Sequence, residues 1–154
     1  MTTPQFGTPE TGRAYADRPA AFGIAERDGR IALVRVEKPG HAPWLDLPGG
    51  ALDPGEDAAQ AVVREFGEET GLKVRAEDSY AQADQYFVNT DGAAYNNRGT
   101  FFRVAVVAEA AELKIEAELP RWSCEVRSKD GRISVGMSSR LRAVGEVLGV
   151  GDDE

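Results

Sequence analysis

The sequence predicts an α+β fold, because segments of strand type and of helix type are mixed along one chain. Apolar runs of strand length recur from about residue 20 to 36 and from 72 to 108, with Asp-Gly turns among them. Apolar residues at helical spacing occur over about 56–70 and again over 138–148. A length of 154 residues fits one domain of ordinary size.

The first strands are expected on either side of the turn Arg27–Arg30, which contains Asp-Gly between two apolar runs. The runs are AAFGIAE, which begins at residue 20, and RIALVRV, which ends at residue 36. A short strand at 44–47 follows, and Pro48-Gly49-Gly50 is expected to end it, since proline and glycine interrupt strands.

The central helix is predicted from Glu56 or Asp57 to Thr70, with Asp53-Pro54 as its opening and Gly71 as its C-terminal cap. Strands are expected next at 73–77, 79–88 and 100–108, with a turn at 89–92 between the last two. Another strand at 119–123, a second Asp-Gly turn at 130–131 and a helix at 138–148 complete the pattern. We expect an irregular lead-in at 1–17, a single domain at 18–150 and a free tail at 151–154.

The charge of the chain is acidic, with a formal net charge of −8. This charge disfavours binding to the backbone of a nucleic-acid duplex. The segment 119–142 is nevertheless basic, and we expect it to border either the substrate site or a contact in a homodimer. A single cysteine and the lack of any long apolar run predict a cytoplasmic protein that does not enter a membrane.

Three carboxylates are expected on one face of the central helix. Residues of a helix are about 100° apart, so Glu65, Glu68 and Glu69 share a face, and an apolar stripe lies beside it. Carboxylates held this close repel each other, and a hard divalent cation such as Mg²⁺ relieves that repulsion. Gly49 and Gly50 would allow a ligand to approach the backbone closely. The alternative is a solvated acidic helix face.

The complete spacing distinguishes these interpretations. Gly50 is followed after five residues by Glu56, and after seven more by Arg64-Glu65; Phe66, Glu68-Glu69, Gly71 and Leu72 then fill the remaining fixed positions. This pattern resembles the Nudix box at every fixed position. The resemblance implies a mixed sheet between helices, an αβα sandwich, and it covers the chain well from about residue 20 to 122.

The resemblance also implies a chemistry. Nudix hydrolases, including MutT-like members, use Mg²⁺ or Mn²⁺ to cleave a pyrophosphate bond in a nucleoside diphosphate linked to another group, or in a nucleoside triphosphate. It implies Glu65, Glu68 and Glu69 as metal ligands, with a carbonyl of Gly50 or Gly49 completing the set. Glu65 would double as the catalytic base, and Arg64 and Glu56 would orient the site. Glu116 and Glu118, outside the box, are alternative bases, although a solvated acidic loop is the simpler interpretation of both.

Candidate substrate contacts outside the box are Arg18 and Arg35 for phosphates, and Tyr86, Phe87 or Tyr95 for stacking on a base. Each also has an ordinary structural interpretation, as surface charge or as core. Relatives that cleave ADP-ribose often carry a proline about 15 residues past the box, where this chain has Phe87. Relatives that cleave dinucleoside polyphosphates often carry a tyrosine at what are here residues 88–90. Neither marker is present, so a nucleoside triphosphate stays open as substrate. A Nudix-fold module that binds a nucleotide without cleaving it is the second hypothesis.

Overall fold

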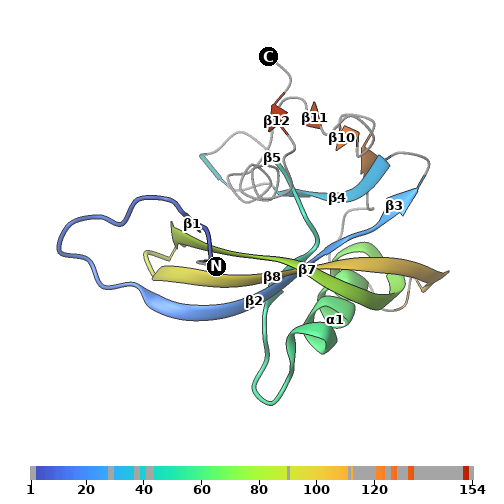
Figure 1. Ribbon diagram of the computed structural model, residues 1–154, viewed down its shortest axis with the longest axis horizontal. Coiled ribbons are helices and arrows are strands. Elements are labelled where there is room, and N and C mark those ends of the chain that lie inside the picture. Colours follow the sequence, from blue (N-terminus) through green and yellow to red (C-terminus); the bar gives the residue numbers. More distant parts are fainter. Residues whose placement is uncertain are drawn as a thin grey trace.

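The main sheet of the protein is mixed and has five strands in the order β1-β7-β8-β2-β6 (Figure 1). The computed structural model describes residues 3–27, 30–36, 39–40, 44–89, 91–110, 112, 121–123, 126–127, 132–133 and 151–152. The strands are β1 (Gln5–Phe6), β2 (Ala16–Ile24), β6 (Gly49–Ala51), β7 (Leu72–Val88) and β8 (Ala94–Glu109). The pairs β1–β7 and β2–β8 are parallel, whereas β7–β8 and β2–β6 are antiparallel.

A second sheet is built around β4 (Arg30–Val36), which pairs antiparallel with β3 (Glu26–Arg27), β5 (Trp44–Asp46) and β9 (Arg121–Ser123). A small third sheet contains β10 (Val126–Arg127), β11 (Arg132–Ile133) and β12 (Gly151–Asp152). The helix α1 lies on one side of the main sheet and β4 lies on the other (Figure 1). The predicted mixed sheet is therefore confirmed, whereas the predicted helix at 138–148 lies outside the described residues.

The helix α1 (Ala58–Thr70) begins and ends at capping residues. The N-cap Asp57 accepts a hydrogen bond from the Gln60 N–H at 2.8 Å, and the Gln60 side chain accepts one from the Asp57 N–H at 2.9 Å. At the other end Gly71 adopts a left-handed φ of 71° and donates to the Gly67 carbonyl at 2.9 Å. The end at Gly71 confirms the prediction, and so does the N-cap at Asp57, which is one of the two predicted starting residues; Asp53-Pro54 precede the helix.

Two hydrophobic clusters hold the layers together, one on each face of the main sheet. Side chains of α1, including Val62 and Phe66, pack on Ala21, Phe102 and further residues of the helix-facing cluster. The opposite cluster joins Phe22 and Phe101 to Leu33 of the second sheet and to Leu47, which directly follows β5. Neighbouring residues such as Phe101 and Phe102 enter different clusters, because side chains alternate between the faces of a strand.

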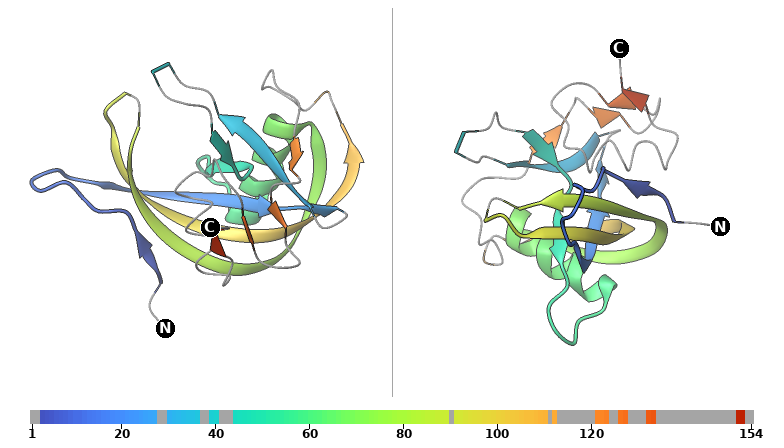
Figure 2. Two further views of the ribbon diagram at one scale, coloured as in Figure 1. Left: turned by 90° about the horizontal axis from the view of Figure 1, so that it is seen from above. Right: turned by 90° about the vertical axis from the view of Figure 1, so that its left-hand side faces the viewer.

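Several predicted boundaries are wrong because pairing between distant strands overrides local signals. Gly49-Gly50, expected to interrupt the chain, form β6 against β2. The segments 73–77 and 79–88 are one strand with register shifts between Ala76 and Ala81, and its curvature is visible in Figure 2. The expected lead-in contains β1 and the start of β2, and the expected free tail contributes β12. The division of the chain into domains stays a prediction.

The expected hairpin at 20–36 is also divided between two sheets. Its second half pairs as predicted, since β3 and β4 are antiparallel on either side of the turn. Its first half, β2, instead pairs with β6 and β8 in the main sheet. The consequence is that β2 lies inside the main sheet, between β8 and β6, and directly beside Gly49 and Gly50 of β6.

The N-terminal strand offers a test of how β1 is held. Gly7 and Gly12 both adopt left-handed backbone conformations, at φ 78° and 79°. An added Cβ at Gly7 would lie 2.8 Å from the Tyr86 carbonyl oxygen, whereas at Gly12 it would meet nothing within 4 Å. We expect Gly7→Ala to detach β1, with a loss of about 3 kcal/mol, and Gly12→Ala to cost about 1 kcal/mol of backbone strain.

Hydrogen exchange of the Asp84 amide measures this directly, because that amide donates to the Pro4 carbonyl at 2.9 Å. Exchange should accelerate about 100-fold in Gly7→Ala and much less in Gly12→Ala, since local opening costs decide exchange rates. Equal protection in the two variants would contradict the proposed packing of β1.

Candidate active site

The loop before α1 is held against the helix by β6. Phe22 pairs with Gly49 and Ala21 with Gly50 across the two strands. An added Cβ at Gly49 would lie 2.2 Å from the Ala21 carbonyl oxygen, and its φ is 153°, so this position requires glycine. An added Cβ at Gly50 would lie 2.8 Å from Oε1 of Glu65. The missing side chain of Gly50 thus leaves the space in which the carboxylate of Glu65 lies.

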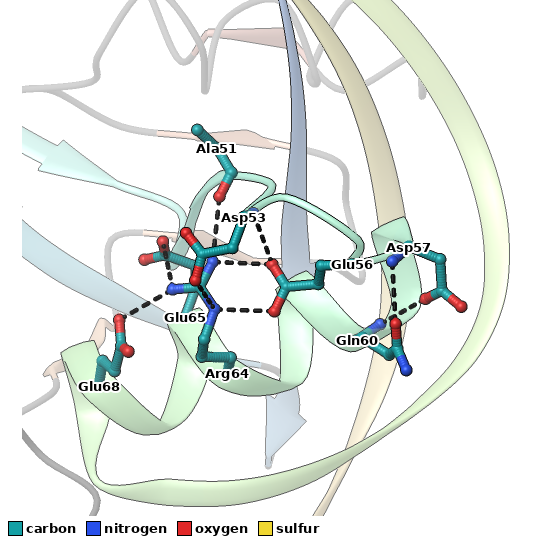
Figure 3. Close-up of polar contacts among 8 residues, drawn as sticks. All are labelled: Ala51, Asp53, Glu56, Asp57, Gln60, Arg64, Glu65 and Glu68. Carbon is teal, nitrogen blue, oxygen red and sulfur yellow. Dashed lines mark hydrogen bonds and ion pairs between the residues drawn. The ribbon is translucent and has the colours of Figure 1, made fainter.

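Arg64 is the centre of the polar network that joins this loop to the helix (Figure 3). Its Nε and Nη2 donate to the two carboxylate oxygens of Glu56 at 2.8 and 2.9 Å, which is a bidentate contact. Its Nη1 donates to Glu65 at 3.0 Å and to Glu68 at 3.1 Å. Arg64 and Glu56, the two residues expected to orient the site, thus contact each other, and the same guanidinium holds two of the carboxylates expected to bind metal.

Two contacts of Arg64 were not predicted. Nη2 also donates to the Ala51 carbonyl at 3.1 Å, and Asp53 lies 3.2 Å from Nε. The backbone N–H of Asp53 donates to Glu56 at 2.9 Å. These contacts tie the loop to the first half of the helix. The Arg64 guanidinium keeps the pKa of Glu56 below its usual range, because the hydrogen bond stabilises the ionised carboxylate.

Glu65 and Glu69 lie deeper than Glu68 and influence each other. The Gly49 N–H donates to Glu69 at 3.1 Å, and Glu69 also shares a hydrogen bond with Glu65. Burial first, and then the charges of Glu65 and Asp46, raise the pKa of Glu69 to about 9. Burial also raises the pKa of Glu65, although the contact with Arg64 opposes the shift. At neutral pH Glu69 therefore holds a proton and donates it toward Glu65.

The donor set has the chemistry that a hard divalent cation requires. Oxygen ligands from carboxylates are the ones that Mg²⁺ and Mn²⁺ prefer. In the present arrangement, no three His, Cys, Asp or Glu side chains among the described residues converge as a metal-binding group. Arg64 holds Glu65 and Glu68, and burial raises the pKa of Glu69, which favours its protonated form. The guanidinium of Arg64 and the protonation of Glu69 both reduce the repulsion among the carboxylates, as a divalent cation would also do.

The other predicted residues are placed differently. Arg18, on β2, lies over the rings of Phe87 and Tyr95, with its guanidinium carbon 5.7 and 5.3 Å from their centroids. Tyr86 instead packs edge-on against Tyr15, with ring centroids 5.1 Å apart. Arg35 belongs to β4, and Glu116 and Glu118 lie outside the described residues, as does most of the basic segment 119–142.

Asp46 is a further acid near the site that sequence patterns did not identify. It is 7% exposed, at the end of β5, and its Oδ1 accepts a hydrogen bond from the Leu47 N–H at 2.8 Å. Its charge contributes to the raised pKa of Glu69. A buried aspartate next to the Pro-Gly-Gly loop could have been suspected from the charge alone, but nothing in its spacing links it to Glu69.

A comparison with protein families matches residues 15–127 to the NUDIX domain. The chain belongs to the Nudix family. The match begins before β2 and ends at β10, so it includes the main sheet from β2 onward, the loop with Gly49 and Gly50, and α1. The box identified from its residue spacing, residues 50–72, also contains the ion pairs that Arg64 makes with Asp53, Glu56, Glu65 and Glu68.

Two curated relatives match shorter parts of the chain. An RNA pyrophosphohydrolase of Sphingopyxis alaskensis is 38% identical over 69 residues, which are 44% of this chain and 43% of the relative. A putative 8-oxo-dGTP diphosphatase of Bacillus subtilis is 66% identical over 51 residues, 33% of each chain. The matched part thus spans less than half the length of these relatives.

A solved structure supports the fold. The MutT protein of Methanosarcina mazei superposes with a TM-score of 0.67 at 22% identity, and the superposition covers 90% of this chain and 96% of that one. At this identity the similarity concerns the arrangement of the elements. In a separate observation, no helix within the described residues is long and apolar enough to cross a bilayer.

Proposed function

We propose that this Nudix protein hydrolyses a pyrophosphate bond in a nucleotide, either a nucleoside diphosphate linked to another group or a nucleoside triphosphate. The observation that carries the proposal is the network at α1, where Arg64 fixes Glu56, Glu65 and Glu68 while Glu69 is held by the Gly49 N–H. The two curated relatives described above are named for hydrolysis of pyrophosphate bonds in RNA and in 8-oxo-dGTP. Because these substrates differ, the similarity supports the reaction class rather than one substrate.

Each residue of this network has a separate role in the proposed reaction. Glu65, Glu68 and Glu69 would hold Mg²⁺ or Mn²⁺, and the bound cation would lower the pKa of water and neutralise the charge of the substrate. Glu65, whose carboxylate lies against Gly50 and is partly shielded from solvent, accepts the proton of the attacking water. Arg64 and Glu56 keep this carboxylate oriented before the substrate arrives.

A Nudix-fold module that binds a nucleotide without cleaving it is the second candidate. One observation favours it: Arg64 engages Glu65 and Glu68 at 3.0 and 3.1 Å, which are two of the three expected ligands. In such a module the arginine would stay in place and the carboxylates would serve only the fold. The protein would then bind nucleotides equally well with and without a divalent cation.

Removal of divalent metal separates the two candidates. We expect the protein to release phosphate or a nucleoside monophosphate from at least one member of a panel containing nucleoside triphosphates, nucleoside diphosphate sugars and dinucleoside polyphosphates. Excess chelator should abolish turnover, and Mg²⁺ or Mn²⁺ should restore it, because the carboxylates need the cation to accept an anionic substrate. Turnover that continues unchanged in chelator would refute the metal-dependent reaction, and nucleotide binding without any turnover would favour the module.

A further inference from the structure

The face of the main sheet opposite α1 carries a polar row followed by an aromatic row. Register pairs place Arg18 opposite Asn97 and Asn97 opposite Gln85, so these three side chains cross β2, β8 and β7. In the neighbouring row, Tyr95 pairs with Phe87. Their rings are stacked, with centroids 5.5 Å apart and an interplanar angle of 28°.

This face continues from the hydrophobic cluster that packs against the second sheet. Ala20, Ala83 and Phe101 belong to that cluster, and alternate residues along each strand point to the same face. Going along β2 from Phe22, the face therefore presents first apolar and then small residues, and finally the polar row at Arg18. The two rows lie at the end of the sheet away from the packed core.

Asn97 has a polar atom without a partner in this row. The residue is 3% exposed, and its Oδ1 makes no hydrogen bond within the described residues. Buried polar atoms almost always have a partner, so each exception requires an explanation. An acceptor held by the sheet beside an arginine and two aromatic rings is the arrangement expected where a ligand supplies the missing N–H.

Arg18 supplies a donor next to this acceptor. Its guanidinium lies over the stacked pair Phe87 and Tyr95, which fixes its position through cation–π contacts. Among the residues that the structure describes, no carboxylate forms an ion pair with Arg18. The row thus offers N–H donors from Arg18, an oxygen acceptor from Asn97, and flat aromatic surface beside both.

The rows are joined to the box loop through β2. The Leu52 N–H donates to the Pro19 carbonyl at 3.1 Å, and Gly50 pairs with Ala21. Arg18 is three residues from Ala21 along β2, a rise of about 10 Å. A nucleotide has the same order of groups, since its sugar separates the planar base from the phosphates.

We propose that Arg18 and Asn97, flanked by Phe87 and Tyr95, form the subsite that binds the heteroaromatic base of the nucleotide. This inference rests on the proposed function, because the phosphates of the same molecule would lie at the box loop. The Oδ1 of Asn97 accepts an N–H of the base, Arg18 donates to an oxygen or ring nitrogen beside it, and the aromatic pair supports Arg18. Arg18 thus contacts the base, not the phosphates as the sequence suggested, and Tyr86 lies on the other face.

Titration calorimetry with nucleoside monophosphates of the four common bases, and with ribose 5-phosphate as the base-free probe, tests the subsite without requiring turnover. The wild type should bind at least one monophosphate more tightly than ribose 5-phosphate. Asn97→Leu should weaken that binding about tenfold, the effect of one hydrogen bond that leaves a buried donor unpaired. Its melting temperature should equal or exceed that of the wild type, because an unpaired buried atom has been removed.

Asn96→Leu is the matched control. Asn96 is on the same strand and is also 3% exposed, but it faces the other way and exchanges hydrogen bonds of 3.0 and 3.2 Å with Gln5. This variant should bind nucleotides normally and melt at a lower temperature. Arg18→Gln, at a half-buried position, provides a second variant with the same expected loss of base binding.

The outcomes separate the subsite from the proposed function. Wild-type affinity for monophosphates in both Asn97→Leu and Arg18→Gln would overturn the subsite, and so would equal binding of ribose 5-phosphate and the monophosphates by the wild type. Weakened binding in these variants would support the subsite even if no substrate is hydrolysed. In that case only the proposed hydrolysis would fail.

Discussion

Glu65→Gln is expected to reduce kcat by about 10²–10⁴, which is the usual contribution of a positioned acid or base. Glutamine keeps the shape of the side chain and one oxygen, but it cannot accept the proton of water. Glu68→Gln and Glu69→Gln should show losses of the same order at low Mg²⁺, because each removes a charged ligand. Excess metal should partly restore a variant that lacks only a ligand and should not restore Glu65→Gln. Steady-state kinetics across a Mg²⁺ series measure both effects.

The same substitutions should not destabilise the metal-free protein. The folded-state pKa of Glu69 is about 9, above its ordinary value of 4.5, so the folded protein binds the extra proton. The stability that this proton confers is fully present below about pH 4.5 and is lost as the pH rises toward 9. Glu69→Gln keeps an uncharged group there at every pH. It should therefore melt above the wild type at pH 8, by roughly 2–4 °C per kcal/mol relieved, and near it at pH 5.

Near-normal rates in all three variants at low Mg²⁺ would refute the catalytic role of the helix and favour the nucleotide-binding module. A variant that is inactive and also unfolds early would show only that the fold was damaged. Thermal unfolding of the same protein samples is therefore the control for the kinetics. The combination that supports the account is retained stability together with a large loss of rate.

Gly49→Ala should mainly lower the free energy of unfolding, whereas Gly50→Ala should mainly lower kcat, although the two residues are neighbours. A Cβ at Gly49 would meet the backbone oxygen of Ala21 at 2.2 Å and the Phe22 Cα at 2.7 Å, and its φ of 153° strains any other residue. Backbone atoms in a paired strand cannot yield easily. We expect a loss of about 3–5 kcal/mol in unfolding free energy from overpacking and strain together.

A Cβ at Gly50 would meet only the end of the Glu65 side chain, at 2.8–3.1 Å, and that side chain can rotate away. The stability loss should be about 1 kcal/mol, while displacement of the carboxylate should lower kcat about 100-fold, as misplacement by about 1 Å can. Thermal unfolding and kinetics on both variants provide the comparison. A stable, fully active Gly50→Ala would show that the position of Glu65 against Gly50 is unimportant for the reaction.

The local parts of the fold were predictable and the long-range parts were not. The cap at Gly71 and the shared face of Glu65, Glu68 and Glu69 follow from spacing on one helix, whereas Glu56 reaches Arg64 from the loop before the helix. The strand at Gly49-Gly50 does not, because glycine signals a break and only the partner β2 makes the pairing favourable.

The candidate site shows the same division between local and long-range information. The proximity of Asp46 to Glu69 joins residues from different elements, and no periodicity contains it. The choice between Tyr86 and its neighbour Phe87 as the partner of Arg18 depends on which face of β7 each residue occupies. A shift of register by one residue reverses these faces, and the register shifts within β7 could not be located from the sequence.

The central claim is that the carboxylates of α1 hold the divalent cation on which hydrolysis depends. The most direct measurement is the binding of Mn²⁺ in the absence of nucleotide, followed by electron paramagnetic resonance in the wild type and in Glu65→Gln, Glu68→Gln and Glu69→Gln. The account predicts that the wild type binds Mn²⁺, more tightly at pH 8 than at pH 6 because the proton on Glu69 must leave. It also predicts weaker binding in each variant. Equal Mn²⁺ binding by the wild type and all three variants would contradict it.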